Sequence, residues 1–500
     1  NGDGYADVIV SSPDYDSTAS NRGRVFVYLG SASGLGTTAA WTQDGTQDSR
    51  FGSSAATAGD VNGDGYADVV IGADSHDTDQ FFEGRAYLYL GSGAGLAATA
   101  AWTAEGNSIG AHFGYSVATA GDVNGDGYAD VIVGAEAFSN GQSGEGGSLV
   151  FMGSAAGLAT TPAWAIESDI ANARRGTSVS TAGDFNGDGY ADVIVGSPKD
   201  DGTVGSMDLY FGSAAGLSTS PVFLGFPPDE PGNKFGFSVG TAGDVNGDGY
   251  SDWIVGAYQA NDGQFGAGAA YVGLGSASIP LLSSSWDVLG DRVVGHYGHS
   301  IASAGDVNGD GYSDFIVSAD YYDAGAGTGE GKAYLYLGSA DGPSTTPAWT
   351  ASGNQAFARF GWSVASAGDV NGDGFSDVIV GAMRFTAGLA EQGRVFLYLG
   401  SSSGLAAAPA WTVDGVQASE DFGYSVASAG DVNGDGYADV IIGARGHSNG
   451  QAGEGSAWIY LGSATGLETS PVWSAESNQA GSEFGIAVAG AGDVNGDGYS

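Results

Sequence analysis

Short apolar runs separated by glycine-rich polar stretches follow one another along the whole chain. One unit begins at residues 113–122 with small and β-branched residues, and a polar loop leads from there to the apolar run 131–135. A third run covers residues 148–153, and a fourth begins at Pro162. Runs of this composition between turn residues are typical of β-strands. Because no segment shows the apolar period of a helix, the pattern predicts four strands per unit and almost no helix.

The unit recurs at a nearly constant period. The aspartate that opens its polar loop returns every 60 to 63 residues, at Asp60, Asp122, Asp184, Asp244, Asp306, Asp369, Asp431 and Asp493. We count eight periods: 1–61, 62–123, 124–185, 186–245, 246–307, 308–370, 371–432 and 433–494. Residues 495–500 start a further copy. Four short strands at a fixed period are typical of a β-propeller blade. The sequence predicts one all-β domain over 1–500, a propeller of eight four-stranded antiparallel blades, with a seven-bladed ring or a slice of a longer array as alternatives.

A large aromatic residue opens the fourth strand of each period. Phe223 takes this place once, and tryptophan takes it in the other periods, at Trp41, Trp102, Trp164, Trp286, Trp349, Trp411 and Trp473. The first strand contains mainly small residues, which suit the crowded centre of a ring. The strict register favours packing between blades for the tryptophans, and stacking on a bound glycan is the alternative.

The polar loop has the pattern of a calcium site. In Asp122-Val-Asn-Gly-Asp-Gly-Tyr-Ala-Asp130, oxygen-bearing side chains occupy positions 1, 3, 5 and 9. Gly127 follows the third of them, where a sharp turn costs a glycine least. Ca²⁺ takes about six to eight oxygen ligands, including backbone carbonyls such as that of Tyr128. The Glu that an EF-hand needs at position 12 has no counterpart, and a metal-free Asn-Gly turn would not need four oxygen positions.

Seven copies of the loop are complete, and a partial copy stands at each end of the chain. The complete copies place the predicted calcium ligands at Asp60, Asn62, Asp64, Tyr66, Asp68, Asp122, Asn124, Asp126, Tyr128, Asp130, Asp184, Asn186, Asp188, Tyr190, Asp192, Asp244, Asn246, Asp248, Tyr250, Asp252, Asp306, Asn308, Asp310, Tyr312, Asp314, Asp369, Asn371, Asp373, Phe375, Asp377, Asp431, Asn433, Asp435, Tyr437 and Asp439. The partial copies add Asn1, Asp3 and Asp7 at one end and Asp493, Asn495 and Asp497 at the other. We predict about seven to eight structural Ca²⁺ sites.

The negative charge of the chain favours binding of a cation at these loops. The chain has 14 basic and 58 acidic residues, a net charge of −44. Three carboxylates within a few ångströms repel one another by about 1 kcal/mol per pair even when hydrated. The same charge excludes nucleic acid and anionic membranes as favoured partners. No run of about 18 apolar residues is present, so no membrane span is predicted.

Three features in a fixed order resemble a known family. A Phe-Gly pair opens the first strand, as at Phe113-Gly114, the cation loop follows, and Gly134-Ala135 ends the second strand. This order, found along the whole chain, resembles the FG-GAP repeat of integrin α-subunit propellers and their bacterial relatives. Arg175-Gly176 departs from the pattern and suggests a less well-packed seam. The resemblance implies that the cation loops lie on one face of the propeller and that ligands bind the opposite face.

We therefore expect a non-catalytic role in adhesion or extracellular assembly, with a protein or glycan ligand on the face opposite the calcium loops. Calcium sites in many copies fill at extracellular calcium concentrations, which favours an extracellular or cell-surface location. The connections between strands two and three vary most, and loops of this kind usually carry binding. Their aromatic residues, each of which could instead pack on its own loop, are Tyr15, Phe81, Phe82, Phe138, Tyr258, Phe265, Tyr321, Tyr322 and Phe385.

Three other functions stay open: a lectin-like glycan binder, a structural subunit of an extracellular fibre and, less favoured, a propeller-fold polysaccharide lyase. A lyase needs a cationic cleft for its acidic substrate, and Arg174-Arg175 is the only adjacent basic pair. No nucleophile elbow or phosphate loop is present. The five histidines, His76, His112, His296, His299 and His447, fall in or near loops. The sequence predicts no enzyme.

The two ends of the chain fall inside copies of the loop motif, so we expect a piece of a longer chain. The first period lacks a first strand, and residues 484–494 form a first strand without partners. These could complete one blade within a ring, or join successive molecules by self-association through the chain ends. The duplicated Asn-Gly-Asp-Gly-Tyr argues slightly against closure within one chain.

Overall fold

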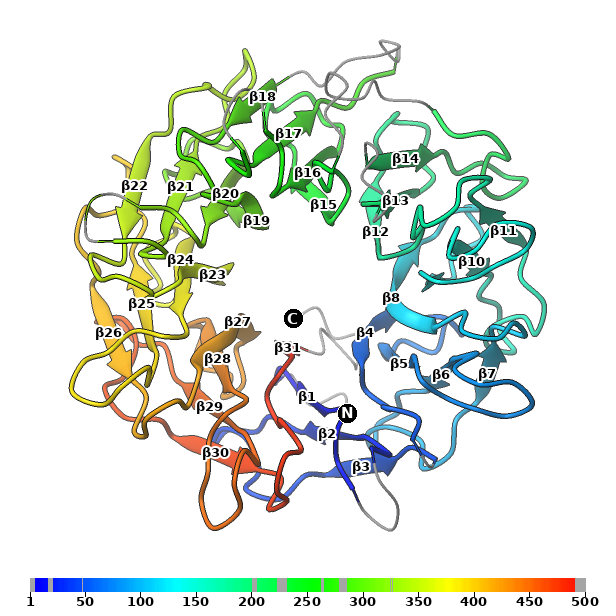
Figure 1. Cartoon of the computed structure of the whole chain (residues 1–500), viewed down its shortest axis with the longest axis horizontal. Coiled ribbons are helices and arrows are strands. Elements are labelled where there is room, and N and C mark those ends of the chain that lie inside the picture. The colour runs from blue at the N-terminus through cyan, green and yellow to red at the C-terminus, as the bar shows by residue number, and fades with distance from the viewer. Residues whose placement is uncertain are drawn as a thin grey trace.

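The computed structural model describes residues 5–16, 21–46, 48–199, 205–222, 232–261, 265–277, 286–323, 325 and 327–490. Within these residues the chain forms β-strands and no helix. The strands assemble into eight antiparallel sheets that surround a central axis as blades (Figure 1). The predicted eight-bladed propeller is therefore confirmed. Five predicted ligands, Asn1, Asp3, Asp493, Asn495 and Asp497, and the aromatic Phe223 lie outside the described residues.

Every blade except blade 1 uses consecutive strands, with the first nearest the axis and the last at the rim (Figure 1). Blade 1 contains β1 (Val8–Ser12), β2 (Arg24–Tyr28) and β3 (Trp41–Asp44) together with β31 (Val488–Gly490). Blades 2 and 3 contain β4 (Ser54–Gly59), β5 (Asp68–Ala73), β6 (Arg85–Tyr89), β7 (Trp102–Glu105), β8 (Phe113–Gly121), β9 (Asp130–Ala135), β10 (Gly147–Phe151) and β11 (Trp164–Glu167). Blades 4 and 5 contain β12 (Ser178–Gly183), β13 (Asp192–Ser197), β14 (Ser206–Tyr210), β15 (Ser238–Gly243), β16 (Asp252–Ala257), β17 (Ala269–Gly273) and β18 (Trp286–Leu289).

The remaining blades repeat the same order. Blade 6 contains β19 (Tyr297–Gly305), β20 (Asp314–Ala319), β21 (Lys332–Tyr336) and β22 (Trp349–Ser352). Blades 7 and 8 contain β23 (Phe360–Gly368), β24 (Asp377–Ala382), β25 (Arg394–Tyr398), β26 (Trp411–Asp414), β27 (Phe422–Gly430), β28 (Asp439–Ala444), β29 (Ser456–Tyr460) and β30 (Trp473–Glu476). Blade 4 has three strands in the described part of the chain, and Val222 forms a bridge to Leu209 where the other blades begin a fourth strand.

The ring closes within one chain. The last strand, β31, pairs antiparallel with β1, with Val488 opposite Val10 and Gly490 opposite Val8 (Figure 1). The Trp473 indole Nε1 donates to the Gly36 carbonyl at 2.9 Å across the same junction. The slight argument against closure that we drew from the duplicated end motif is therefore wrong. Pairing of β31 with β1 satisfies backbone groups on an otherwise open edge, which explains why closure is favoured.

The core is divided among the seams between blades. The second strand of every blade is fully buried, and its two faces contribute to different seams. The tryptophan at the start of each fourth strand packs edge-on against a ring of the following blade, as Trp102 does against Phe151 at 4.6 Å. Its Nε1 donates to a carbonyl of that blade, Ala159 in this case, at 2.8 Å. The predicted role of the tryptophans in packing between blades is confirmed.

The Phe of the Phe-Gly pair packs against the third strand of its own blade. Phe51 lies 5.1 Å from Tyr87 and Phe235 lies 5.0 Å from Tyr271, ring centre to ring centre. Blade 4 replaces both rings by an ion pair between the partly buried Arg175 and the buried Asp208. The departure at Arg175 thus coincides with a second departure in the third strand, and together they place a charged pair beside an otherwise apolar seam.

Candidate metal loops and the opposite face

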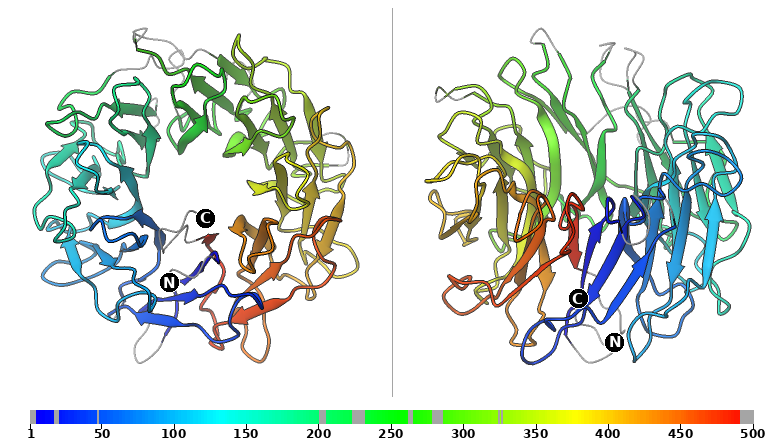
Figure 2. Two further views of the ribbon diagram at one scale, coloured as in Figure 1. Left: turned by 180° about the vertical axis from the view of Figure 1, so that it is seen from behind. Right: turned by 60° about the horizontal axis from the view of Figure 1, so that its bottom comes forward.

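The predicted metal loops lie on one side of the ring. Each joins the first strand of a blade to the second, as residues 122–129 join β8 to β9. Because neighbouring strands run antiparallel between the two sides of the ring, the turns between strands three and four lie on the same side (Figure 2). We call this side the loop face. The connections from strand two to three and from strand four to the next blade form the opposite face.

Side-chain oxygens and backbone N–H groups hold the loop in shape. Asp122 Oδ1 accepts hydrogen bonds from the N–H groups of Gly125 (2.7 Å) and Asp126 (3.1 Å), and Asp122 Oδ2 accepts one from Gly127 (2.8 Å). Asn124 Oδ1 accepts a second bond from Asp126 N–H at 2.9 Å. The same bond from the glycine at position 4 to the first aspartate measures 2.6–2.7 Å in all seven complete loops.

The aspartate at position 9 anchors the loop to the blade. Asp130 is fully buried, and its two oxygens accept hydrogen bonds from Val123 N–H (3.0 Å) and Gly153 N–H (2.8 Å). Burial raises the pKa of Asp130 to about 7, the two N–H groups oppose the rise, and Asp126 and Asp122 add to it. Burial raises the pKa of the corresponding aspartate in each other complete loop in the same way: Asp68, Asp192, Asp252, Asp314, Asp377 and Asp439.

The loops also connect neighbouring blades. The carbonyl of Asp60, at position 1, accepts the N–H of Ala129 in the next blade at 2.9 Å, and the carbonyl of Val61 accepts the N–H of Ser154 at 3.0 Å. Equivalent pairs of bonds leave all seven complete loops, including the bond from Ala6 N–H to the Asp431 carbonyl that leads into blade 1. The loop face therefore carries a belt of hydrogen bonds across the seams that the seven complete loops span, which sequence reasoning did not predict because the partners, such as Asp60 and Ala129, are distant in sequence.

The residue types of the loops fit Ca²⁺. Carboxylate, amide and carbonyl oxygens are hard donors, and an oxygen that accepts one N–H retains a further lone pair. Among the described residues, however, no three His, Cys, Asp or Glu side chains lie close enough together to hold a metal ion between them. The loop oxygens are distributed along the turn and bonded to N–H groups. The assignment of the individual ligands stays a prediction.

The partial copy at the start of the chain adopts part of the same arrangement. Asp7 is fully buried and accepts the N–H of Gly30 at 2.9 Å, as position 9 does in the complete loops. Tyr5 packs over Gly434 of the preceding loop, as Tyr128 packs over Gly63. The described part of the N-terminal copy thus occupies positions 7 to 9 of the loop of blade 1.

The chain's cations lie away from the loop face. All 14 Lys and Arg residues lie in connections of the opposite face or open a third strand that begins there, and all five histidines lie at the same end of the blades. Many of the arginines are paired with acids, as Arg359 is with the buried Asp320 and Arg50 is with Asp14 and Asp74. The basic side chains of this face are therefore largely engaged within the protein.

Large exposed apolar side chains gather on the same opposite face. Among the residues that the structure describes, all but Val472 lie there, and the most exposed are Phe265 (75%), Phe81 (72%), Ile109 (68%) and Val416 (68%). The aromatic residues predicted in the connections between strands two and three differ in their surroundings. Phe138 lines the pocket described below, Tyr258 packs edge-on against Phe237, and Tyr321 lies under Arg359. Phe81, Phe82 and Phe265 are exposed, whereas Tyr15, Tyr322 and Phe385 are covered by Arg24, Lys332 and Arg394 of their own blades.

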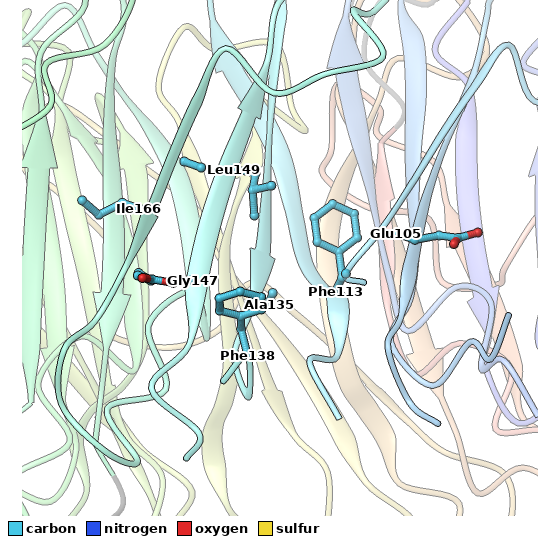
Figure 3. Close-up of a pocket in the computed structure, with 10 residues that line it drawn as sticks. Glu105, Phe113, Ala135, Phe138, Gly147, Leu149 and Ile166 are labelled. Carbon is cyan, nitrogen blue, oxygen red and sulfur yellow. The ribbon is translucent and has the colours of Figure 1, made fainter. Parts of the chain in front are cut away.

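A pocket of about 340 Å³ opens at the seam between blades 2 and 3 (Figure 3). Phe113, Phe138 and Leu149 supply apolar walls, and Glu105 and Glu167 lie at its polar side. The pocket exists because Gly147 stands where blades 1, 2 and 7 have an arginine, and because Leu149 replaces their aromatic ring. Sequence alignment of the periods shows both replacements, but the resulting space becomes apparent only in the folded blade.

Comparison with known proteins agrees with this architecture. The family model described as FG-GAP repeat matches eight segments, which together cover more than half of the chain: residues 1–28, 51–89, 113–151, 175–206, 235–272, 297–336, 360–398 and 422–460. The chain therefore belongs to the FG-GAP repeat family, as the resemblance predicted.

Integrin α subunits are among its relatives. The chain is 35% identical to integrin alpha-IIb of Mus musculus over 34% of its own length and 17% of the relative. It is 32% identical to integrin alpha-V of Gallus gallus over 46% of its length and 21% of the relative. Integrin alpha-5 of Xenopus laevis is also 32% identical, over 42% of the chain's length and 20% of the relative. The chain thus matches only about a fifth of these relatives' length. No described residue belongs to a helix that could cross a membrane.

Proposed function

We propose that this protein is a calcium-stabilised, non-catalytic adhesion propeller that works outside the cell or at its surface and binds a protein ligand through the face opposite the metal loops. The observation that carries the proposal is the distribution of side chains between the two faces. Exposed apolar residues such as Phe81, Ile109 and Phe265 gather on one face, whereas the loop face repeats one acidic turn. Exposed apolar patches on a rigid scaffold are typical of protein interaction sites.

Calcium supports the fold in this proposal. Each complete loop carries three carboxylates within nine residues, one of them fully buried, and no Lys or Arg lies on the loop face to neutralise them. Ca²⁺ would be held by positions 1, 3, 5 and 9 and the carbonyl of position 7, and when bound it supplies the positive charge that the turn lacks. Because the loops also connect the blades, ordering them strengthens the ring.

The ligand face is tested by substitution. We expect the double variant Phe81→Ser and Ile109→Ser to bind at least about tenfold more weakly to those members of a panel of immobilised extracellular-matrix proteins that the unchanged chain binds, because exposed apolar anchors carry much of the energy of such interfaces. Val472→Ser on the loop face is the matched control and should bind normally. Binding by the double variant at full strength, with loss in the control, would contradict the assignment of the face.

A second function, glycan binding, is favoured by an aromatic belt near the axis. Phe237, Tyr258, His299, Trp362 and Tyr424 follow one another through blades 5 to 8, with neighbouring ring centres 4.7–6.0 Å apart. Half-buried rings of this kind can stack against sugar rings. A glycan array read in calcium, with Trp362→Ala as the variant, separates the two functions: saturable binding lost in the variant would favour a lectin.

The remaining alternatives have direct tests. A fibre subunit would form concentration-dependent polymers in analytical ultracentrifugation, although β31 pairs with β1 of the same chain. A lyase would release unsaturated products from pectic or other uronate polymers. Its cationic cleft would have to be built from arginines that are largely paired with acids, as in the pair of Arg174 with Glu136.

A further inference from the structure

Blades 3 and 8 differ from their neighbours at the end of the fourth strand. In blades 1, 2 and 7 an arginine opens the third strand and pairs with the acid that lies opposite it in the fourth, as Arg394 does with Asp414. In blades 3 and 8 Gly147 and Ser456 take the place of the arginine. The acids Glu167 and Glu476 nevertheless remain opposite them, without a guanidinium partner from the third strand.

An asparagine side chain takes over the role of the arginine. Asn140 Nδ2 donates to both oxygens of Glu167, at 2.9 and 3.0 Å, and Asn449 Nδ2 donates to both oxygens of Glu476, at 3.0 Å each. Each asparagine also donates its backbone N–H to the glutamate five residues later in its own loop. One residue therefore ties the loop between strands two and three to the rim of the blade. We call Asn140 and Asn449 the latch asparagines.

Both latch asparagines precede glycine. The chain contains eleven Asn-Gly pairs, and the other nine lie in the metal loops or their partial copies. Asn-Gly is reactive because no Cβ on the following residue shields its nitrogen and because glycine reaches unusual backbone angles easily. In the seven complete loops that glycine N–H donates to an aspartate. In the described part of the chain Gly141 N–H and Gly450 N–H donate to no acceptor, and both glycines face open space at φ 120° and 104°.

We propose that the latch asparagines are sites of spontaneous conversion to aspartate and isoaspartate, and that this conversion releases the two loops. Hydroxide removes the proton of Gly141 N, which attacks Asn140 Cγ. The Cγ–Nδ2 bond breaks, and Nδ2 leaves as ammonia with a proton from water, so that a five-membered succinimide remains. Water then adds to either ring carbonyl and opens the ring. The net reaction consumes one water and releases one ammonia at each site, with no oxidant or reductant.

The metal loops are protected by their own hydrogen bonds. The first step requires loss of the glycine N–H proton, and an N–H that donates to a carboxylate holds its proton more tightly. Gly125 N–H donates to Asp122 Oδ1 at 2.7 Å, and the corresponding glycine N–H donates to the first aspartate in the other six complete loops. The same Asn-Gly sequence is therefore slow to react on one face of the ring and reactive on the other.

Conversion replaces the hydrogen bonds between the latch asparagine and its glutamate by electrostatic repulsion. A carboxylate at position 140 can no longer donate to Glu167 and instead places a second negative charge within hydrogen-bonding distance of it. The loop at 138–146 should then separate from the end of β11, beside the pocket lined by Phe138 and Glu167. The corresponding loop at 447–455 should separate from the end of β30. Both changes make the face opposite the metal loops more negative as the protein ages.

The site of conversion is tested by peptide mass mapping of the intact chain, stored with calcium chloride in ¹⁸O-water at mildly acidic and mildly alkaline pH. We expect a several-fold excess of ¹⁸O incorporation at Asn140 and Asn449 over Asn124 and its counterparts, faster at the higher pH. In a denatured chain the difference should vanish, since it depends on the fold. Equal incorporation at Asn124 in the folded chain, or none at the latch asparagines, would overturn the proposal.

The consequence of conversion is tested by variants. Asn140→Gln should block incorporation at that position while Asn449 continues to react as an internal reference. The double variant Asn140→Asp and Asn449→Asp should show several-fold faster amide hydrogen exchange in residues 138–146 and 447–455, with unchanged exchange in the metal loops. Unchanged exchange in the latch loops would show that the asparagines do not hold them.

Discussion

The two faces of the ring differ in how closely their loops repeat from blade to blade. On the loop face, the bond from the position-4 glycine to the first aspartate varies only between 2.6 and 2.7 Å across seven loops. On the opposite face, the residue before the Phe-Gly position alone changes from Arg50 to His112 to Asp421 around the ring. The loop face joins neighbouring blades through one repeated set of hydrogen bonds, whereas the opposite face joins strands and blades through connections of varied sequence. In our proposal, the loop face supports the fold and the opposite face binds the ligand.

The largest effect is expected on removal of calcium, which should destabilise the chain through the loop face alone. Each site filled at about 100 times its dissociation constant stabilises the folded chain by about 2.7 kcal/mol, and seven complete loops share the effect. We expect a large fall in Tm on addition of a calcium chelator, recovered by excess calcium and only weakly by magnesium. A Tm that does not change would contradict a structural role for the ion.

The chelated chain should lose stability as pH rises. Burial raises the pKa of Asp130 and its six counterparts to about 7. A carboxyl group whose pKa is higher in the folded chain stabilises the fold while it is protonated, and this contribution is lost as pH passes through the folded value. Each unit of raised pKa corresponds to about 1.4 kcal/mol. Thermal melts with chelator between about pH 5 and 8 should therefore show a falling Tm, and melts with calcium a much flatter one.

The ion pair between Arg175 and Asp208 in blade 4 allows a second test of stability, at the end of the blade away from the metal loops. Asp208→Ala leaves the partly buried Arg175 without its carboxylate partner, although the bond to the Tyr210 hydroxyl remains, and should cost about 3 kcal/mol of unfolding free energy. The double variant Arg175→Phe and Asp208→Tyr rebuilds the ring pair that Phe235 and Tyr271 form in blade 5. It should recover most of the loss. Denaturant melts measure both values, and a double variant less stable than Asp208→Ala would show that the seam is polar for another reason.

Within one metal loop, buried and exposed aspartates should behave differently. Asp130→Asn places an amide NH₂ against one of two buried N–H donors and should cost about 1–3 kcal/mol in the chelated chain. Asp126→Asn, at an exposed position of the same loop, is the matched control and should cost little there. In calcium both variants should reduce the stabilisation by the ion. If the two cost the same without calcium, position 9 is not the anchor that its hydrogen bonds indicate.

The smallest effect is expected at the rim. Trp411→Phe keeps an aromatic ring beside Tyr460 but removes the bond from the indole Nε1 to the Glu468 carbonyl, 3.0 Å long. We expect a loss of about 1 kcal/mol and no change in binding at the opposite face. Weaker ligand binding in this variant would show that the rim and the ligand face are coupled.

Much of this arrangement follows from local patterns in the chain. The period of the Asp-x-Asn-x-Asp-Gly loop, the four strands per unit and the inter-blade role of Trp102 and its counterparts follow from residue type and spacing. Side-chain alternation and turn residues act over a few positions, so a single sequence reveals them. The buried state of Asp130 and the belt from Asp60 to Ala129 could not be predicted in the same way, because their partners belong to other turns and to the next blade.

The amino-acid order alone therefore establishes the repeat, the class of fold and the chemistry offered by each loop. The folded ring adds what depends on distant contacts: closure of β31 on β1, the exchange of a ring pair for Arg175 and Asp208, and the different surroundings of two kinds of Asn-Gly pair. The physical reason is range. Turns and strands are set by interactions between close neighbours in sequence, whereas seams, burial and reactivity are set by groups that meet only when the blades pack.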